Sequence, residues 1–400
     1  MAAISSNKVL PPPSERYNVL GWIRRRLFST WYNGLLTVLG LLVSVLAIRG
    51  FIIWAFTQAQ WEVIPTNLRL FMVGQYPPDQ LWRIWIGLFL IALIIGFSWG
   101  VWGSQLGFFG VILGATPLLL AILPFSLEVR LRLIGLSVLG LAGWGAARLK
   151  PSALSRLVVI AWILLFPVFL LLVNGLSGET GWMPRVPTNF WGGLLLTFTL
   201  TVVGIVVSFP IGILLALGRR SDLAVMRLFC VAYIELVRGV PLITLLFMAQ
   251  LMLPLFLPAN ITIDRVVRAT TGIILFSAAY LAENVRGGLQ AIPKGQYEAA
   301  HALGLNGFQT TVRIILPQAL RAVIPILVGQ FIALFKDTTL VAIVGLFDLL
   351  GIARTVLAQP DFIGRQLEVL TFIGAIYWIF SYLMSYFSQR LETVLGVGKR

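Results

Sequence analysis

The sequence is poor in the residues that build disulfides and metal sites. Among its 400 residues there is one cysteine, Cys230, and one histidine, His301. One cysteine cannot form an intramolecular disulfide or a cysteine-cluster metal site, and one histidine cannot form a histidine-rich metal site. We therefore expect no metal and no cofactor. We interpret His301 as a surface residue and not as a proton switch.

Motifs of nucleotide and nucleophile chemistry are missing as well. The phosphate-binding pattern GxxxxGK[ST] is absent, because none of the five lysines fits it. Neither an HExxH nor a GxSxG context occurs. The sequence therefore predicts no catalytic residue, and we do not expect the chain to hydrolyse ATP by itself.

Charged residues are scarce, at 11% of the chain, whereas hydrophobic residues make up 58% and the mean hydropathy is +0.93. Many apolar runs exceed the length of about 18 residues that indicates a membrane helix. The formal net charge of +15 would suit a nucleic-acid partner. However, Lys and Arg lie in short loops beside apolar spans, which is a topology signal. We predict an all-α, polytopic membrane protein of about ten transmembrane helices, with no nucleic-acid partner.

The first half of the chain is predicted to be an accessory membrane region. Residues 1–30 form a polar tail whose Arg24, Arg25 and Arg26 favour a cytoplasmic N-terminus. The apolar run Trp31–Phe56 is too long for a signal peptide. A polar stretch near 57–80 follows, and the apolar run 81–127 is expected to split near an uncharged turn at 100–105. Further spans near 133–147 and 157–173 complete five spans in the accessory region 31–173.

The second half is predicted to be a separate membrane core. A loop at 174–190 forms a periplasmic junction, the core covers 191–389, and residues 390–400 form a cytoplasmic tail. Lys and Arg are moderately enriched in the segments that this arrangement places inside. Five spans after a cytoplasmic N-terminus put residue 190 outside, whereas four or six would invert the core. The expected core spans are about 191–217, 227–257, 267–285, 321–345 and 369–388.

A polar interruption of the core at 293–317 carries its own helical pattern. Pro293 suits a helix start, and Gly304 suits a helix end because glycine takes a positive φ without steric cost. Asn306 can cap a second helix, and Gln309 can complete a variant of the capping box. We predict a helix–turn–helix between two spans. On its second helix, three apolar residues are expected on one side: Val312, Ile315 and Leu316.

This interruption can be read as an amphipathic loop on the membrane surface, but its residues indicate more. Glu298, Ala299 and Ala300, then Gly304, and later Ile315-Leu316-Pro317 resemble the cytoplasmic "EAA" loop of bacterial ABC-importer permeases. The resemblance covers roughly residues 188–400 and is specific, because several letters stand at fixed offsets. It departs at His301, where relatives often carry Arg. The resemblance implies that the loop docks on an ATPase subunit through five residues: Glu298, Ala299, Ala300, Gly304 and Leu305.

Two charged residues lie near the start of the second core span. Glu235 and Arg238 stand at i, i+3 and can pair on one helix face. The alternatives are a neutralising salt bridge near the cytoplasmic boundary and a place on a transport pathway. Gly239 and Pro241 interrupt the helix, as in spans that line a pathway. The stretch resembles the "E-x-x-R-G-x-P" signature of permeases for polar amino acids, which implies a pathway role for Glu235, Arg238 and Gly239.

Two further charges, Lys336 and Asp337, lie deep in an apolar run. Neighbours in a helix point about 100° apart, so each needs a partner elsewhere. They could pair with other helices for assembly or form a polar translocation site. With Thr338 and Thr339, they resemble the "K-x-T-S" stretch of the same family, with Thr339 where Ser is common. The resemblance implies that these four residues contribute to a pathway for amino acids.

The chain is thus identified as similar to the membrane subunit of an ABC importer for polar L-amino acids of acidic, amide or broad range, in the inner membrane with both termini cytoplasmic. Its accessory half resembles the long permeases of general L-amino-acid systems. That resemblance implies four partners: an ATPase dimer, a second and shorter permease, a periplasmic amino-acid-binding protein and the amino acid itself. Two alternatives stay open: an ion-coupled secondary transporter, and a partner permease without its own substrate site.

Overall fold

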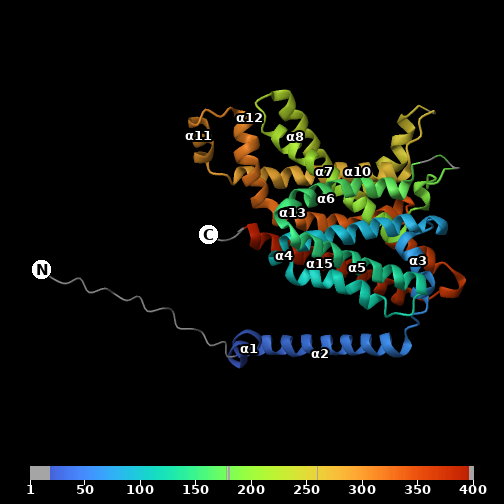
Figure 1. The fold of residues 1–400 in the computed structure, drawn as a ribbon. Coiled ribbons are helices and arrows are strands. Elements are labelled where there is room, and N and C mark those ends of the chain that lie inside the picture. Colours follow the sequence, from blue (N-terminus) through green and yellow to red (C-terminus); the bar gives the residue numbers. More distant parts are fainter. Residues whose placement is uncertain (1–18, 177, 179–180, 259, 396–400) are drawn as a thin grey trace. The chain divides into compact units, whose positions relative to one another are not determined.

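The computed structural model describes residues 19–395 except 177, 179–180 and 259 (Figure 1). The expected tail residues 1–18 and 396–400 lie outside this range. Within it the chain is helical, and two isolated bridges, Gly74 with Trp191 and Gly193 with Asp348, are the β-type pairings. By packing, the chain forms two compact units, Met1–Trp61 and Glu62–Arg400. The division falls between Trp61 and Glu62, after the first predicted span.

The first unit contains α1 (Val19–Leu27) and α2 (Trp31–Ile53), which ends in a π-helical turn, Trp54–Gln58. Thr30 caps α2, because its side chain accepts a hydrogen bond from the backbone N–H of Asn33. No residue of α2 is buried by the rest of the described chain, although the helix is apolar all round. Such a surface suits a lipid environment. The helix covers the first predicted span.

The second unit begins with four helices: α3 (Val63–Val73), α4 (Leu81–Leu120), α5 (Leu127–Leu149) and α6 (Pro151–Asn174). A Cβ atom on Gly110 would lie 2.3 Å from the Trp99 ring. In a straight helix, eleven residues advance about 16 Å. Helix α4 must therefore fold back between Trp99 and Gly110, a stretch that includes the turn predicted at 100–105. After the bend, Gly114 accepts a hydrogen bond from Ser137 of α5.

The rest of the second unit follows the predicted core. It contains α7 (Gly193–Arg219), α8 (Ala224–Arg238), α9 (Leu242–Phe247) with its irregular extension to Phe256, α10 (Arg265–Gln290), α11 (Lys294–Ala302), α12 (Gly307–Thr310), α13 (Leu316–Asp337), the 3₁₀ helix Thr338–Val344, α14 (Leu349–Leu357) and α15 (Gln366–Leu395). In the described part of the chain, eight helices are long and apolar enough to cross a membrane, or nine with the bent pair α8–α9. The part of α4 after Gly103 is not among these candidate spans.

Helices α7, α10 and α13 set the two ends of the core. Gly204 and Gly212 of α7 lie against Ile273 and Leu281 of α10, so these two helices run in the same direction. Helix α13 runs the opposite way, because Ala319 lies beside Gly288, near the end of α10. Residues 293–317 therefore stand at one end, here called the loop end. Thr188, Asp264 and Gly345 stand at the other, here called the far end. In Figure 1, α11 and α12 lie opposite α3 within this unit.

The stretch 57–80, predicted as polar, contains a helix of the core. Val63 and Phe71 of α3 are buried against Leu349, Val356 and Val369. Helix α3 escapes detection because its eleven residues are too few for a span and polar residues flank it. Behind it, Gly74 has φ +64° and its Cβ would lie 2.4 Å from the Cα of Gly192, so only glycine fits there.

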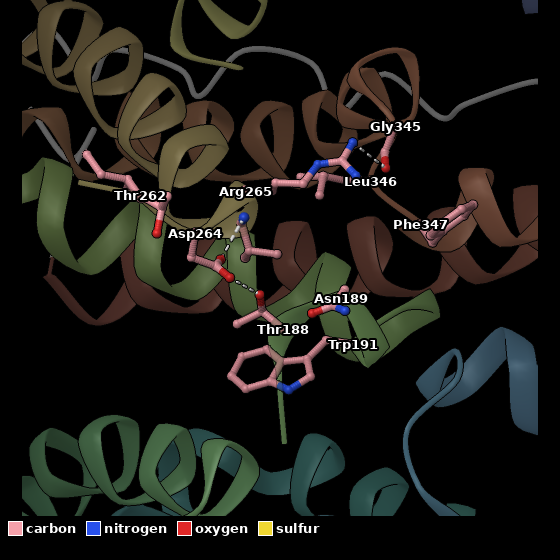
Figure 2. A pocket seen from close by; sticks show the side chains of 11 residues that line it. Thr188, Asn189, Trp191, Thr262, Asp264, Arg265, Gly345, Leu346 and Phe347 are labelled. Carbon is pink, nitrogen blue, oxygen red and sulfur yellow. Dashed lines mark hydrogen bonds between the residues drawn. The ribbon is translucent and has the colours of Figure 1, made fainter. Parts of the chain in front are cut away.

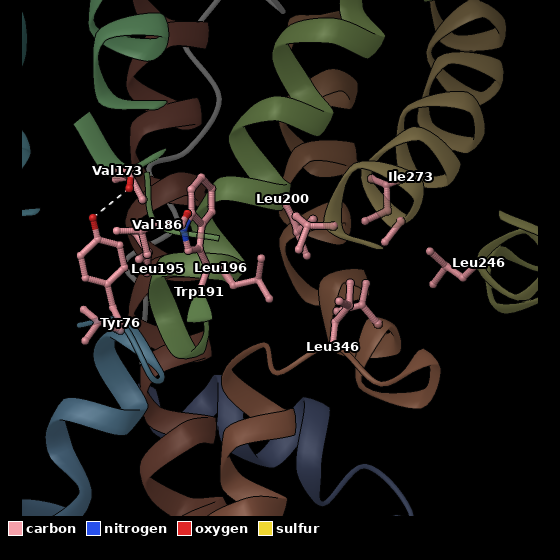
Figure 3. Packing of buried hydrophobic residues seen from close by; sticks show 14 of the residues in the cluster. Tyr76, Val173, Val186, Trp191, Leu195, Leu196, Leu200, Leu246, Ile273 and Leu346 are labelled. Atoms are coloured by element: carbon pink, nitrogen blue, oxygen red, sulfur yellow. Dashed lines mark hydrogen bonds between the residues drawn. The ribbon is translucent and has the colours of Figure 1, made fainter. Parts of the chain in front are cut away.

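The accessory helices α4 and α6 share a hydrophobic cluster with the core (Figure 3). Tyr76 and Val173 from the first half pack with Trp191, Leu196 and Leu200 of the second. The Tyr76 hydroxyl, which is buried, donates a hydrogen bond to the carbonyl of Val173 at 2.8 Å. Between helices in a membrane, packing of this kind stabilises through van der Waals contact and hydrogen bonds. The packing joins the two halves into one unit from Glu62 onward.

Candidate functional site

The loop 293–317 forms the predicted helix–turn–helix. Helix α11 begins one residue after Pro293, and Gly304 takes φ +75° at the turn. Asn306 Oδ1 accepts from the N–H of Gln309 at 2.8 Å, and Gln309 Oε1 accepts from the N–H of Asn306 at 3.1 Å. This reciprocal pair is the capping box expected from the sequence, and it fixes where α12 begins.

One face of the loop packs on the core. Tyr297 and Ile315 join a cluster with the ends of α7, α8 and α10. The hydroxyl of Tyr297 accepts a hydrogen bond from Arg220 Nη1 at 3.3 Å. Ala300 is almost fully buried, so a larger side chain there would disturb the packing of α11. The loop is therefore anchored and does not simply lie on a membrane surface.

The other face of the loop is exposed. Glu298, Ala299 and His301 point away from the core, as expected for His301. Leu303 and Phe308 are 78% and 77% exposed, which the sequence interpretation missed. The available signal was their position: two apolar residues in a polar turn, on either side of Gly304. Exposed apolar side chains that are rimmed by polar residues mark protein contacts.

One detail of the second helix differs from the prediction. Ile315 is buried and Leu316 packs beside it, but Val312 is exposed. The reason is a π-helical turn, Thr311–Ile315, which inserts an extra residue into the helical repeat. The wider turn moves Val312 off the face that Ile315 occupies.

At the loop end, a cluster of opposite charges joins three helices. Glu283 of α10 lies 3.3 Å from Arg219 of α7 and 3.7 Å from Arg238 of α8, and it also pairs with Arg286. Arg219 also pairs with Glu235 of α8 at 3.0 Å. The expected pair of Glu235 with Arg238 is therefore replaced by bonds from each to a neighbouring helix. The neighbouring helices place an opposite charge near each of these residues at the ends of the spans. Glu235 and Arg238 therefore do not need to pair with each other along their own helix.

The helix break predicted at Gly239 and Pro241 is present. Helices α8 and α9 meet there at an angle of 104°. Pro241 precedes α9 and cannot donate a backbone hydrogen bond, so the helix of α8 ends at Arg238. Gly239 caps α8 through a bond from its N–H to the carbonyl of Glu235. The break separates a span into two arms of different direction.

Lys336 and Asp337 stand where α13 changes to the 3₁₀ helix Thr338–Val344. The hydroxyls of Thr338 and Thr339 donate to the carbonyls of Phe335 and Lys336 and so hold this change in place. Lys336 is exposed and Asp337 is half-buried. Within the described residues, neither charged group has an ion pair or a hydrogen bond.

The structure does not bring the predicted pathway residues into one site. Gly204 lies against both Ile273 and Leu334, which puts Lys336 near the level of Ile273 on α10. Glu283 follows Ile273 by ten residues, or about 15 Å along a helix. Glu235 and Arg238 therefore belong to the loop end, whereas Lys336 and Asp337 lie further along the core toward the far end.

These features are those of a polytopic membrane transport subunit: apolar spans, a broken span, unpaired charges within a span and an anchored loop with an exposed apolar tip. The model of the family described as "binding-protein-dependent transport system inner membrane component" matches residues 208–393. Over 97% of both chains, the protein is 40% identical to the inner membrane amino-acid ABC transporter permease protein YhdY of Escherichia coli K12. The chain belongs to this family of ABC-importer permeases.

Further relatives differ in length. The glutamate/glutamine/aspartate/asparagine transport system permease protein BztC of Rhodobacter capsulatus is 39% identical over 96% of this chain and 95% of its own. The glutamate/aspartate import permease protein GltK of Escherichia coli O157:H7 is 36% identical, over 53% of this chain and 98% of its own. A solved structure of an amino acid ABC transporter with histidines is 29% identical over 50% of this chain and 92% of its own, with a TM-score of 0.44.

Proposed function

We propose that this permease carries polar L-amino acids into the cell through the inner membrane, driven by a separate ATPase subunit. The relatives of full length are named as amino-acid permeases, which supports the substrate class. The observation that carries the mechanism is the loop 293–317, with a buried anchoring face and an exposed tip. The loop is a rigid element that a partner at the loop end can push.

In this proposal the ATPase dimer binds the exposed face of the loop. Leu303 and Phe308 supply apolar contact, and Glu298, Ala299 and Leu305 complete the surface around Gly304. A loop displaced by the ATPase acts on α13 directly, because the chain continues from α12 through the π-helical turn into α13. Coupling requires that docking differ in free energy between the inward- and outward-facing states.

The substrate pathway in this proposal includes Lys336, Asp337, Thr338 and Thr339. An unpaired charge within a span is costly, so a partner from outside the chain is expected. An amino acid offers a carboxylate for Lys336 and an ammonium group for Asp337. The bend at Gly239 gives the neighbouring span room to move. Glu235 and Arg238 contribute at the loop end of the same pathway.

The proposal includes two further partners and an orientation. A second, shorter permease pairs with this chain, and a periplasmic binding protein delivers the amino acid at the far end. Both termini and the loop 293–317 are cytoplasmic, and the junction 174–190 is periplasmic. The length of GltK, about half of this chain, supports the existence of short permeases in the family.

Reconstitution in proteoliposomes tests the function. The chain is combined with the ATPase, the second permease and the binding protein, and uptake of radiolabelled L-glutamate and L-glutamine is measured. We expect uptake that requires ATP, and ATP hydrolysis that rises with the loaded binding protein. Uptake that is driven by a sodium or proton gradient without ATP would identify a secondary transporter instead.

Variants of the loop test the coupling step in the same assay. Glu298→Lys and Gly304→Asp should abolish uptake without preventing membrane insertion, because both residues are exposed and no burial cost is added. The matched control is His301→Arg, which changes an exposed residue of the same helix and should leave uptake intact. Normal uptake with normal ATP turnover in either loop variant would contradict the assignment of this loop.

A further inference from the structure

The far end of the core contains a cavity of about 320 Å³ (Figure 2). It lies at the N-terminus of α10, away from the loop 293–317 and from the charged cluster around Glu283. Three chain segments form its wall, one before α7, one before α10 and one before α14. The lining residues are Thr188, Asn189, Trp191, Thr262, Ile263, Asp264, Arg265, Val266, Gly345, Leu346 and Phe347.

Two opposite charges line this cavity. Asp264 accepts hydrogen bonds from the N–H groups of Val266 and Val267 and from the Thr188 hydroxyl, at 2.8, 3.2 and 2.5 Å. Arg265 donates from Nη2 to the carbonyls of Val344 and Gly345 at 3.3 and 3.4 Å, which are long bonds. Both side chains are exposed, and within the described residues Asp264 and Arg265 have no ion pair, either with each other or with another residue.

Polar groups without an internal partner stand beside these charges. In the described chain, the side chains of Asn189 and Thr262 make no hydrogen bond, and both line the cavity. Figure 2 shows Asn189 and Asp264 on different sides of the same opening. The Trp191 ring, which is buried, forms part of the wall. A concave site with a few convergent polar groups is the usual form of a small-molecule site.

We propose that this cavity is an outer binding site for a zwitterionic α-amino acid. Asp264 meets the ammonium group, and Arg265 with Asn189 meets the carboxylate. The charge of the lining selects this class of ligand: an anion alone would meet Asp264, and a cation alone would meet Arg265. A ligand with one charge of each sign satisfies both residues. The volume exceeds that of one amino acid and leaves room for water.

A short stretch of chain connects the wall of the cavity to the inner charged residues, Lys336 and Asp337. Its wall at Gly345 directly follows the 3₁₀ helix that starts after Asp337. Seven residues of 3₁₀ helix span about 14 Å, so an amino acid in the cavity lies one short helix from Lys336 and Asp337. An outer and an inner site on one helix provide two successive positions for the same ligand. This inference rests on the proposed amino-acid permease function and deepens it.

The test measures binding of radiolabelled L-glutamine, whose side chain adds no charge, to the full-length protein in lipid nanodiscs. Asp264→Asn removes the charge but keeps the helix cap, because Asn caps as well as Asp. Arg265→Gln keeps a donor for the carbonyls of Val344 and Gly345. The matched controls are Asp361→Asn and Arg365→Gln, which remove the same charges outside the cavity. All are compared in a Lys336→Gln, Asp337→Asn background, which isolates the outer site.

We expect saturable binding that weakens about tenfold or more in Asp264→Asn and in Arg265→Gln, since each loses a charge-assisted hydrogen bond. The controls should bind as the background does. N-acetyl-L-glutamine and L-glutamine α-amide, which each lack one charge, should compete poorly. Equal binding in all variants, or no binding in the background, would overturn the inference. ATP-driven uptake by the unmodified complex is measured separately, so its absence identifies failure of the proposed function instead.

Discussion

The core contains two groups of charged residues that are treated in opposite ways. At the loop end, Glu283 is surrounded by Arg219, Arg238 and Arg286, and every member of the cluster has a partner on its own or a neighbouring helix. Further along the core, Lys336 and Asp337 have no charged partner among the described residues. The residues of the first group form ion pairs with one another, whereas Lys336 and Asp337 require partners from outside the described chain.

We infer from this difference that the first group is structural, and we propose that the second serves transport. A charge inside a membrane span is expensive unless it is paired, so a chain retains unpaired ones where a ligand, water or partner subunit meets them. The Glu283 cluster holds α7, α8 and α10 together at the end where the loop 293–317 is attached. Lys336 and Asp337 lie where α13 changes to the 3₁₀ helix Thr338–Val344.

The largest loss of stability is expected from Glu283→Gln. The change leaves three arginines around a neutral side chain that is only 22% exposed, which should cost about 3 kcal/mol. Thermal unfolding of the protein in nanodiscs measures it. The control is Glu128→Gln, which removes the 70% exposed partner of Arg132 and should cost less than about 1 kcal/mol. Similar losses of stability in both variants would contradict the inference that the Glu283 cluster stabilises the protein more than an exposed ion pair does.

Asp348 is a buried carboxylate that forms no ion pair within the part of the chain that the structure describes. It caps α14 at the far end, between two spans, and burial raises its pKa to about 7, although the N–H groups of Gly351 and Leu350 oppose the shift. The folded state therefore holds a proton more tightly than the unfolded state. The contribution of Asp348 to stability should therefore be greatest below about pH 4 and fall as the pH rises to about 7, by roughly 2–4 kcal/mol.

Asp348→Asn tests that pH dependence. Asn keeps the helix cap and cannot ionise, so the difference in unfolding free energy between the variant and the unmodified protein should change across this pH range. The variant should gain relative stability as the pH rises. A difference that is constant from pH 4 to pH 8 would mean that the carboxyl group of Asp348 titrates normally.

A smaller effect is expected at the edge of the Glu283 cluster. Glu235 is 56% exposed and, among the described residues, pairs with Arg219 alone, so Glu235→Gln should cost about 0.5 kcal/mol. Arg219 keeps Glu283 as a partner in this variant. Chemical or thermal unfolding of Glu235→Gln and Glu283→Gln under the same conditions compares the two acidic residues of one cluster. A cost equal to that of Glu283→Gln would show that Glu235 and not Glu283 is the central acid.

Local signals predicted much of this structure. The turn at Gly304, the capping box of Asn306 and Gln309, and the break at Gly239–Pro241 each depend on a few adjacent residues, and each is present. The split of the apolar run 81–127 was expected at an uncharged turn near 100–105, and α4 folds back somewhere between Trp99 and Gly110. Such features depend on backbone chemistry that neighbours in sequence determine.

Interactions between distant segments could not be predicted in the same way. The pairing of Glu235 and Arg238 was inferred from their spacing, but Arg219 and Glu283 compete for them from helices far along the chain. The helix α3 was hidden in a stretch interpreted as polar, because its role depends on Leu349 and Val369 almost 300 residues later. The cavity near Asp264 likewise combines three segments that no local pattern connects.

The comparison is tested most directly by Asp337→Asn in the assembled complex with ATPase, second permease and binding protein. We expect amino-acid uptake to fall at least tenfold, with assembly and basal ATP hydrolysis retained and the unfolding free energy changed by less than about 1 kcal/mol. This result is expected because Asp337 has no partner to lose within the described chain. Normal uptake, or loss of the complex from the membrane, would contradict a substrate role for Asp337.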